Sequence, residues 1–173
     1  PSPSLDPEPE PKLHNPLRTL LPRYWSFSLA TDGWGQALDV FTTGQDVAGH
    51  HAPAAAVHIG LQGRVRVGHS LDYKYLKLPF DITIHHARSI EPRWGLRIDD
   101  EWKTWPELRY SGSISLTAPI VTADWAQFFT FTWGLAWMQS DEPIDVPVDP
   151  NAALPHLPDR GWLSGITLDW WFT

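Results

Sequence analysis

Histidine is the first candidate for metal or acid–base chemistry in this 173-residue chain, which contains eight of them. Two pairs are adjacent in sequence, His50–His51 and His85–His86. Neighbouring residues of a β-strand point to opposite faces, so neither pair can chelate one ion from within a strand. The ligand spacing of a Zn²⁺ site is missing, and the chain has no Cys. We therefore expect neither a metal site nor a cofactor.

Acid–base pairs are the second candidate. If the turn at 76–80 sets the register of its strands, Asp81 comes near Lys74 and His85 comes near Ser70. Cross-strand ion pairs that line a wet interior explain this pattern better than catalysis does.

Two further motifs lack the spacing that their chemistry needs. The serine-rich stretch at 111–117 has no G-x-S-x-G sequence, so it does not indicate a nucleophile. The acidic run at 99–101 lacks the spaced ligands of a Ca²⁺ loop. The chain is not expected to be an enzyme.

Tryptophan is unusually frequent, with 11 residues. Three of them, Trp94, Trp102 and Trp105, lie in a polar stretch at 88–108 that we interpret as a loop. Exposed indoles stack on sugars, so a soluble, Trp-rich β-sandwich that binds carbohydrate is an alternative function. Anchoring of these indoles at a membrane interface is the competing explanation.

Charge and composition limit the partners. The net charge of −7 argues against a nucleic-acid binder, which would carry a basic patch. Six prolines in the first sixteen residues prevent sheet pairing there, so residues 1–23 are interpreted as a periplasmic linker. Residues 24–173 form the second unit, in which apolar and polar residues alternate. No run approaches the ~20 apolar residues of a membrane helix, a test that does not detect membrane strands.

This alternation predicts eight strands, since a period of two is typical of β-structure. We expect them at 24–30, 36–43, 54–62, 64–75, 80–85, 110–117, 125–137 and 162–172. If neighbouring strands are antiparallel, the connections at 44–49, 76–80 and 119–124, all short, lie at one end. The other end has the connections at 31–35 and 62–64 and both long ones, at 88–108 and 139–161. Outer-membrane barrels show this asymmetry, with their long loops outside the cell.

The two faces of the expected strands differ in a way that a soluble sheet would not require. One face is large and aromatic, whereas the other is small and polar, which indicates lipid on one side and a lumen on the other. The expected lipid-facing or interfacial aromatic residues are Trp25, Phe27, Tyr73, Tyr75, Trp125, Phe129, Phe131, Trp133, Trp137, Trp162, Trp170 and Phe172. The expected lumen-facing polar residues are His58, Arg64, Arg66, Asp72, Lys74, Asp81, His85, Ser111, Ser113, Ser115, Thr130, Thr132, Thr167 and Asp169.

The opening of the strand region also resembles a known family. The stretch PLRTLLPRYW at 16–25, followed by FTTGQDVAGHHA at 41–52, is similar to the start of the bacterial outer-membrane barrel that follows TolB-like β-propellers. That barrel is distantly similar to the surface antigen D15 and BamA barrels. The turn carries the most specific residues, Gly44, Asp46, Gly49, His51 and Ala52. Pro53 departs from the pattern, and so does Thr173, which stands where such barrels end on an aromatic residue.

Together these features predict an all-β fold, an antiparallel up-and-down transmembrane β-barrel in the bacterial outer membrane. Its partners would be the lipid bilayer and further barrel strands or other envelope proteins, with no nucleic acid. Its role would be structural, in transport or in assembly. Barrels of the similar family have more than eight strands, and the small lumen residues would fill an eight-strand ring poorly. We therefore expect the chain to be part of a larger barrel.

Overall fold

The computed structural model describes residues 19–63, 65–98, 101–122, 125–141 and 160–172, with the backbone alone at 94–98 and 101–103. The described residues form eight strands: β1 (Tyr24–Asp32), β2 (Gly35–Thr43), β3 (His51–Gly60), β4 (Arg66–Tyr75), β5 (Asp81–Ile98), β6 (Glu101–Val121), β7 (Ala126–Ser140) and β8 (Gly161–Phe172). Each lies where the alternating pattern predicts a strand. No helix in this part of the chain is long and apolar enough to cross a membrane.

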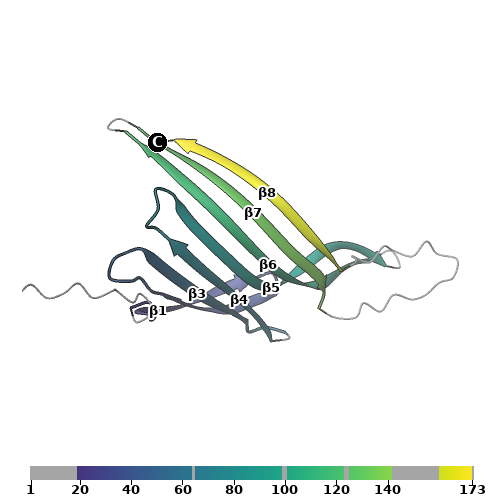
Figure 1. Cartoon of the computed structure of the whole chain (residues 1–173). Helices are drawn as coiled ribbons and strands as arrows, with labels where there is room; N and C mark the ends of the chain where they lie inside the picture. Colours follow the sequence, from purple (N-terminus) through teal and green to yellow (C-terminus); the bar gives the residue numbers. More distant parts are fainter. Residues whose placement is uncertain (1–18, 64, 99–100, 123–124, 142–159, 173) are drawn as a thin grey trace, which may run out of the picture.

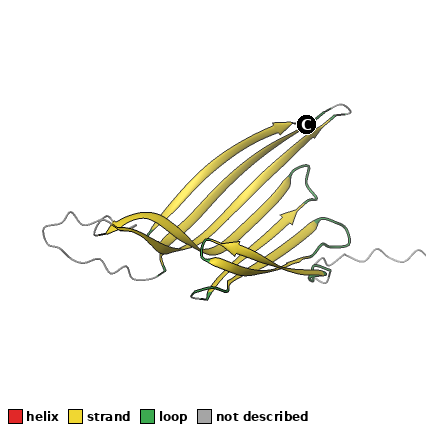
Figure 2. Ribbon diagram, turned by 180° about the vertical axis from the view of Figure 1, so that it is seen from behind, coloured by secondary structure: helices red, strands yellow, loops and turns green. Residues whose placement is uncertain are grey.

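All eight strands belong to one antiparallel up-and-down sheet, in the order β1 to β8 (Figure 1). The all-β, up-and-down prediction is confirmed. The sheet is open: β1 and β8 are its two edges and do not pair with each other. Figure 2 shows this open, curved sheet from behind.

The stretch at 88–108 is not a loop. There β5 and β6 continue as a long hairpin beyond the ends of their neighbours, with a register shift between Arg93 and Leu96. Two prolines of this stretch, Pro92 and Pro106, lie opposite each other in the ladder. The carbonyl of Pro106 accepts a hydrogen bond from the backbone N–H of Asp141, so the polar backbone groups of Pro106 face away from β5. The missing N–H therefore removes no bond between β5 and β6.

The register expected for β4 and β5 is wrong by two residues. Lys74 lies opposite Thr83 rather than near Asp81, and Asp72 rather than Ser70 lies opposite His85. A shift of two residues leaves every side chain on its expected face, because the side-chain period of a strand is also two. The sequence pattern alone does not distinguish the two registers for this reason.

The sheet curls so that the β1–β2 hairpin crosses over one of its faces (Figure 1). A Cβ at Gly33, in the tip of this hairpin, would clash with the ring of Pro92 in β5, four strands away. Glycine is required for this approach because any side chain would push the tip off the sheet.

This single layer has almost no core. In the described part of the chain the buried apolar side chains are those of Ala37, Leu108 and Ala136, and no large side chain is fully buried. Soluble domains bury their sheets against a second layer. Here such a layer is absent among the described residues.

Candidate functional site

The register divides the side chains between two faces, because residues opposite each other in a ladder share a face. The first, which we call the apolar face, is illustrated by the row Tyr73, Ile84, Ile114, Trp133 and Ile166 across β4 to β8. It also carries eleven of the twelve aromatic residues expected to face lipid: Trp25, Phe27, Tyr73, Tyr75, Phe129, Phe131, Trp133, Trp137, Trp162, Trp170 and Phe172. The twelfth, Trp125, precedes β7, and its carbonyl accepts a hydrogen bond from Thr122 in the turn.

The second face, the polar face, carries the residues expected in the lumen: His58, Arg66, Asp72, Lys74, Asp81, His85, Ser111, Ser113, Ser115, Thr130, Thr132, Thr167 and Asp169. Arg64 lies outside the described residues. The hydroxyls pair across strands: Ser115 Oγ lies 2.8 Å from Thr132 Oγ1, and Thr117 Oγ1 lies 3.1 Å from Thr130 Oγ1. Two aromatic pairs, Phe128–Trp171 and Tyr24–Phe41, interrupt this face.

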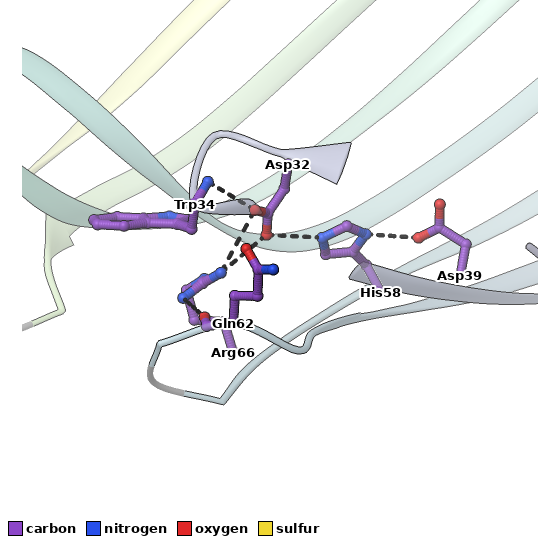
Figure 3. A network of polar contacts seen from close by, with 6 residues as sticks. All are labelled: Asp32, Trp34, Asp39, His58, Gln62 and Arg66. Atoms are coloured by element: carbon purple, nitrogen blue, oxygen red, sulfur yellow. Dashed lines mark hydrogen bonds and ion pairs between the residues drawn. The ribbon is translucent and has the colours of Figure 1, made fainter. Parts of the chain in front are cut away.

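A network of charges connects four strands on the polar face (Figure 3). Nδ1 of His58 in β3 lies 2.6 Å from Oδ1 of Asp39 in β2, its directly opposite residue. Nε2 of the same ring lies 3.3 Å from Oδ2 of Asp32, at the end of β1. Since a carboxylate only accepts hydrogen bonds, both contacts act as hydrogen bonds when the imidazole is protonated.

Arg66 in β4 completes this network. Its Nη2 lies 3.2 Å from Asp32 Oδ2, and its Nη1 donates to the Gln62 carbonyl at 3.1 Å. The guanidinium carbon lies 5.0 Å from the centre of the Trp34 ring, and the backbone N–H of Trp34 donates to Asp32 Oδ1 at 2.7 Å. The Arg66 side chain is 7% exposed, so these contacts are largely shielded from water. They fix the tip of the β1–β2 hairpin over β3 and β4.

The geometry of this network is that of a structural clamp, made of the Asp32–Arg66 ion pair and the contacts of His58 with two carboxylates. A histidine that acts as a general base needs one ring nitrogen directed at a nucleophile or a water. Both nitrogens of His58 face carboxylates, so neither is directed at a hydroxyl. A groove of about 330 Å³ lies beside the clamp, lined in part by Ser70, Ala87 and Glu91. This groove opens on the polar face.

Two smaller charge clusters lie further along the sheet. Nδ1 of His85 is 2.8 Å from Asp72 Oδ1, and Arg93 Nη2 is 2.8 Å from Glu107 Oε1. Across the described residues, no group of three or more His, Cys, Asp or Glu side chains is placed to hold a metal ion.

The turn between β2 and β3 contains the residues that suggested the family resemblance. Asp46 is buried, and its Oδ1 accepts the N–H of His51 at 2.9 Å. Burial raises the pKa of this carboxyl, but backbone N–H groups of His51, His50 and Ala48 and the charge of the His51 ring outweigh it, so the pKa lies below 3.8. Gly49 adopts a φ of 73°, which favours glycine. Asp46 and Gly49 therefore have a local structural role in this turn.

Sequence reasoning missed Asp32, Trp34 and Asp39 as members of a site. The alternation predicts that Asp39 lies on the polar face, but its pairing with His58 depends on the β2–β3 register. Asp32 and Trp34 lie at a hairpin tip, and they reach Arg66 because the sheet curls. No sequence signal reports that curl.

Three tryptophans are the candidates for stacking on sugars in the alternative function. The side chains of Trp94 and Trp102 lie outside the described residues, and Trp105 is half-buried opposite Arg93. Comparison with family models, with curated proteins and with solved structures yields no match to this chain.

Proposed function

We propose that this chain is an integral β-barrel component of the bacterial outer membrane, with its apolar face against lipid and its polar face lining a wet interior. One observation carries the proposal: a single curved sheet with almost no core exposes large apolar side chains on one face. Phe27 is 77% exposed, Leu168 78% and Phe172 71%. In water such a face would drive aggregation, whereas in a bilayer it is solvated by acyl chains.

The apolar side chains on the apolar face of the strands together form an apolar band. The position of this band from strand to strand supports tilted strands. On β7 the band runs from Phe129 to Trp137 and is flanked on the same face by Gln127 and Gln139. The middle of the band on β1 is Phe27, which shares a ladder row with Trp137 at the end of the β7 band. The band thus crosses the strands obliquely, as a level membrane does when barrel strands are tilted.

The ends of the sheet fit an outer-membrane orientation. Short connections join β2 to β3, β4 to β5 and β6 to β7 at one end. The long β5–β6 hairpin and the long β7–β8 connection lie at the opposite end. This asymmetry supports long connections outside the cell and short turns in the periplasm. Resemblance to barrels that follow TolB-like propellers is consistent with the same location.

The role of such a barrel is structural, in transport or in assembly, with a wet interior as the common element. Small side chains dominate the polar face of β6 and β7, including Ser113, Ser115, Thr132 and Gly134. The interior of an eight-strand ring is normally filled by its own side chains, whereas side chains as small as those of β6 and β7 would leave space for water. This favours a ring of more than eight strands, in which β1 and β8 pair with other strands.

Reconstitution into phosphatidylcholine vesicles tests the location. After refolding from urea, the protein should float with the vesicles in a sucrose gradient and stay with them through an alkaline carbonate wash. Without detergent or lipid it should aggregate. A monodisperse protein in plain buffer, with no vesicle association, would contradict the proposal. That result would instead favour a soluble carbohydrate-binding module, whose β-sandwich needs a second sheet.

Closure is tested separately by cysteine cross-linking between the edge strands. Ser28 on β1 and Thr167 on β8 both lie on the polar face. Pairs of cysteines at these and neighbouring polar-face positions should form no disulfide within one chain. Efficient intrachain cross-linking would show an eight-strand ring and refute the larger barrel.

A further inference from the structure

A group of polar side chains interrupts the apolar face on β4 and β5. His69 of β4 and His86 and Arg88 of β5 lie on this face, among neighbours such as Leu71 and Ile84. We call these three residues the basic cluster. A charged side chain that faces lipid is strongly destabilising at the bilayer midplane and costs little near the interface. A cluster of this kind therefore needs a polar partner or a place at headgroup depth.

Aromatic residues lie beside the cluster on the neighbouring strands. Arg88 lies opposite His69 in β4 and opposite Tyr110 in β6, and the same row continues through Trp137 and Trp162. Tyr and Trp concentrate at headgroup depth in membrane proteins. On β5 to β7 this row lies toward the end of the apolar band on the side of the long connections, whereas on β1 it passes through the middle of the band, because the band is oblique to the rows.

The cluster is held in a defined geometry. The Arg88 guanidinium carbon lies 5.9 Å from the centre of the Tyr110 ring, and Arg88 Nε donates to the Tyr110 hydroxyl at 3.3 Å. Arg88 also donates to the Val67 carbonyl. The rings of His69 and His86 lie 5.5 Å apart. A guanidinium held in this way loses less side-chain entropy when it binds an anion.

A groove of about 360 Å³ begins beside the cluster. Its floor is Gly112 of β6, which lies between His86 of β5 and Leu135 of β7 in the ladder. A Cβ at Gly112 would have its nearest contact at 3.7 Å, so glycine leaves open space that a larger side chain would fill. The other lining residues include Ile114, Trp133 and Trp162. The groove is thus apolar along its length and polar where it meets His86.

We propose that this groove and the basic cluster form a binding site for a phospholipid whose headgroup carries a net negative charge. The phosphate binds Arg88 and the imidazoles of His69 and His86, and an acyl chain lies in the groove over Gly112. Charge-assisted hydrogen bonds from guanidinium to phosphate are strong and geometrically specific. The site rests on the proposed function, since the apolar face must meet lipid for the site to be occupied.

Lipid retention in native mass spectrometry tests the proposal. The protein in dodecyl maltoside micelles is offered phosphatidic acid, phosphatidylcholine or inorganic phosphate. Phosphatidic acid should bind at least about tenfold more tightly than phosphatidylcholine, because its phosphomonoester has a net negative charge that the choline group of phosphatidylcholine offsets, and one charged hydrogen-bonded contact provides this discrimination. Inorganic phosphate should not displace it, because the acyl chain contributes to binding. Equal retention of the two lipids, or full displacement by millimolar phosphate, would overturn the proposal.

Variants separate the two parts of the site. Arg88→Gln should reduce phosphatidic acid binding to the phosphatidylcholine level, whereas Lys74→Gln removes a charge from the polar face and should change nothing. Gly112→Val should weaken retention of both lipids by filling the groove. Because Arg88 also contacts Val67 and Tyr110, His86→Gln serves as a second headgroup variant that leaves those contacts in place. Unchanged selectivity in both Arg88→Gln and His86→Gln would refute the site.

The vesicle flotation assay keeps the two proposals distinguishable. A protein that floats but shows no preference for phosphatidic acid contradicts this site alone. A protein that does not float contradicts the proposed function, and the lipid site with it.

Discussion

Replacing Phe131 by arginine tests the assignment of the two faces directly. Phe131 lies on the apolar face of β7 between Leu116 and Leu168 on the neighbouring strands. Thr132 is the next residue and lies on the polar face between Ser115 and Thr167. The two substitutions introduce the same charge one residue apart on the same strand, so they differ mainly in the face that receives it.

The expected magnitude follows from the depth of Phe131. The β7 band from Phe129 to Trp137 is centred at Trp133. Phe131 is two residues from that centre, which is about 5 Å along the membrane normal for a strand rise of ~3.4 Å and a tilt of ~45°. At that depth an arginine on the lipid face costs about 2–4 kcal/mol. Thr132→Arg loses one hydrogen bond, to Ser115 at 2.8 Å, which costs about 1 kcal/mol.

Urea unfolding in phosphatidylcholine vesicles, followed by tryptophan fluorescence, measures both free energies of unfolding. Thr132→Val provides the matched control for loss of the hydroxyl without a new charge. Phe131→Arg should be the more destabilising variant by at least about 1 kcal/mol on these figures. Equal losses in the two arginine variants, or a larger loss at Thr132, would refute the assignment of faces.

Three further predictions follow from the clamp, the β2–β3 turn and the ends of the sheet. Asp32→Asn and Arg66→Gln should each lower the free energy of unfolding by about 1–3 kcal/mol. The double variant should lose less than the sum of the two, because the two side chains share one ion pair. Strictly additive losses would show that the two residues do not form the clamp. The free energy of unfolding should fall as the pH drops below 3.8, because the folded-state pKa of Asp46 is lowered and its carboxylate stabilises the fold only while it is ionised. In Asp46→Asn this acid-dependent loss of stability should be absent from a pH titration of unfolding. An unchanged pH profile in the variant would contradict the role of the turn. Protease added to intact cells that express the protein should cut the β5–β6 tip and the β7–β8 connection and spare the β2–β3 turn, whereas cleavage confined to that turn would reverse the orientation.

Much of the secondary structure was predictable because a sheet with one apolar face leaves a period of two in the sequence. All eight strands lie where alternation predicts them. The prediction is wrong at 88–108, where prolines and charges hide the alternation, because the strands there extend past their neighbours and have no constant apolar side. The side of each aromatic residue, such as Phe131, was predictable from parity alone.

The candidate site was only partly predictable. Alternation places His58, Arg66 and Asp39 on one face, but it does not determine the distances between them. Their contacts depend on register and on curl, and both are set by interactions between residues far apart in the chain. His58 meets Asp39 through the pairing of β2 with β3, and Asp32 meets Arg66 through the folding of a hairpin over β4.

By itself, the sequence determined the strand positions and the chemistry of each face of the sheet, because a local period of two is enough to specify them. Only the tertiary structure decided the register of β4 on β5, the charge clamp beneath the β1–β2 hairpin, and the groove over Gly112 beside Arg88. Each of these depends on how strands pack and curl across the sheet. A register shift of two residues changes the partners and leaves the pattern intact, so such features have no local signature.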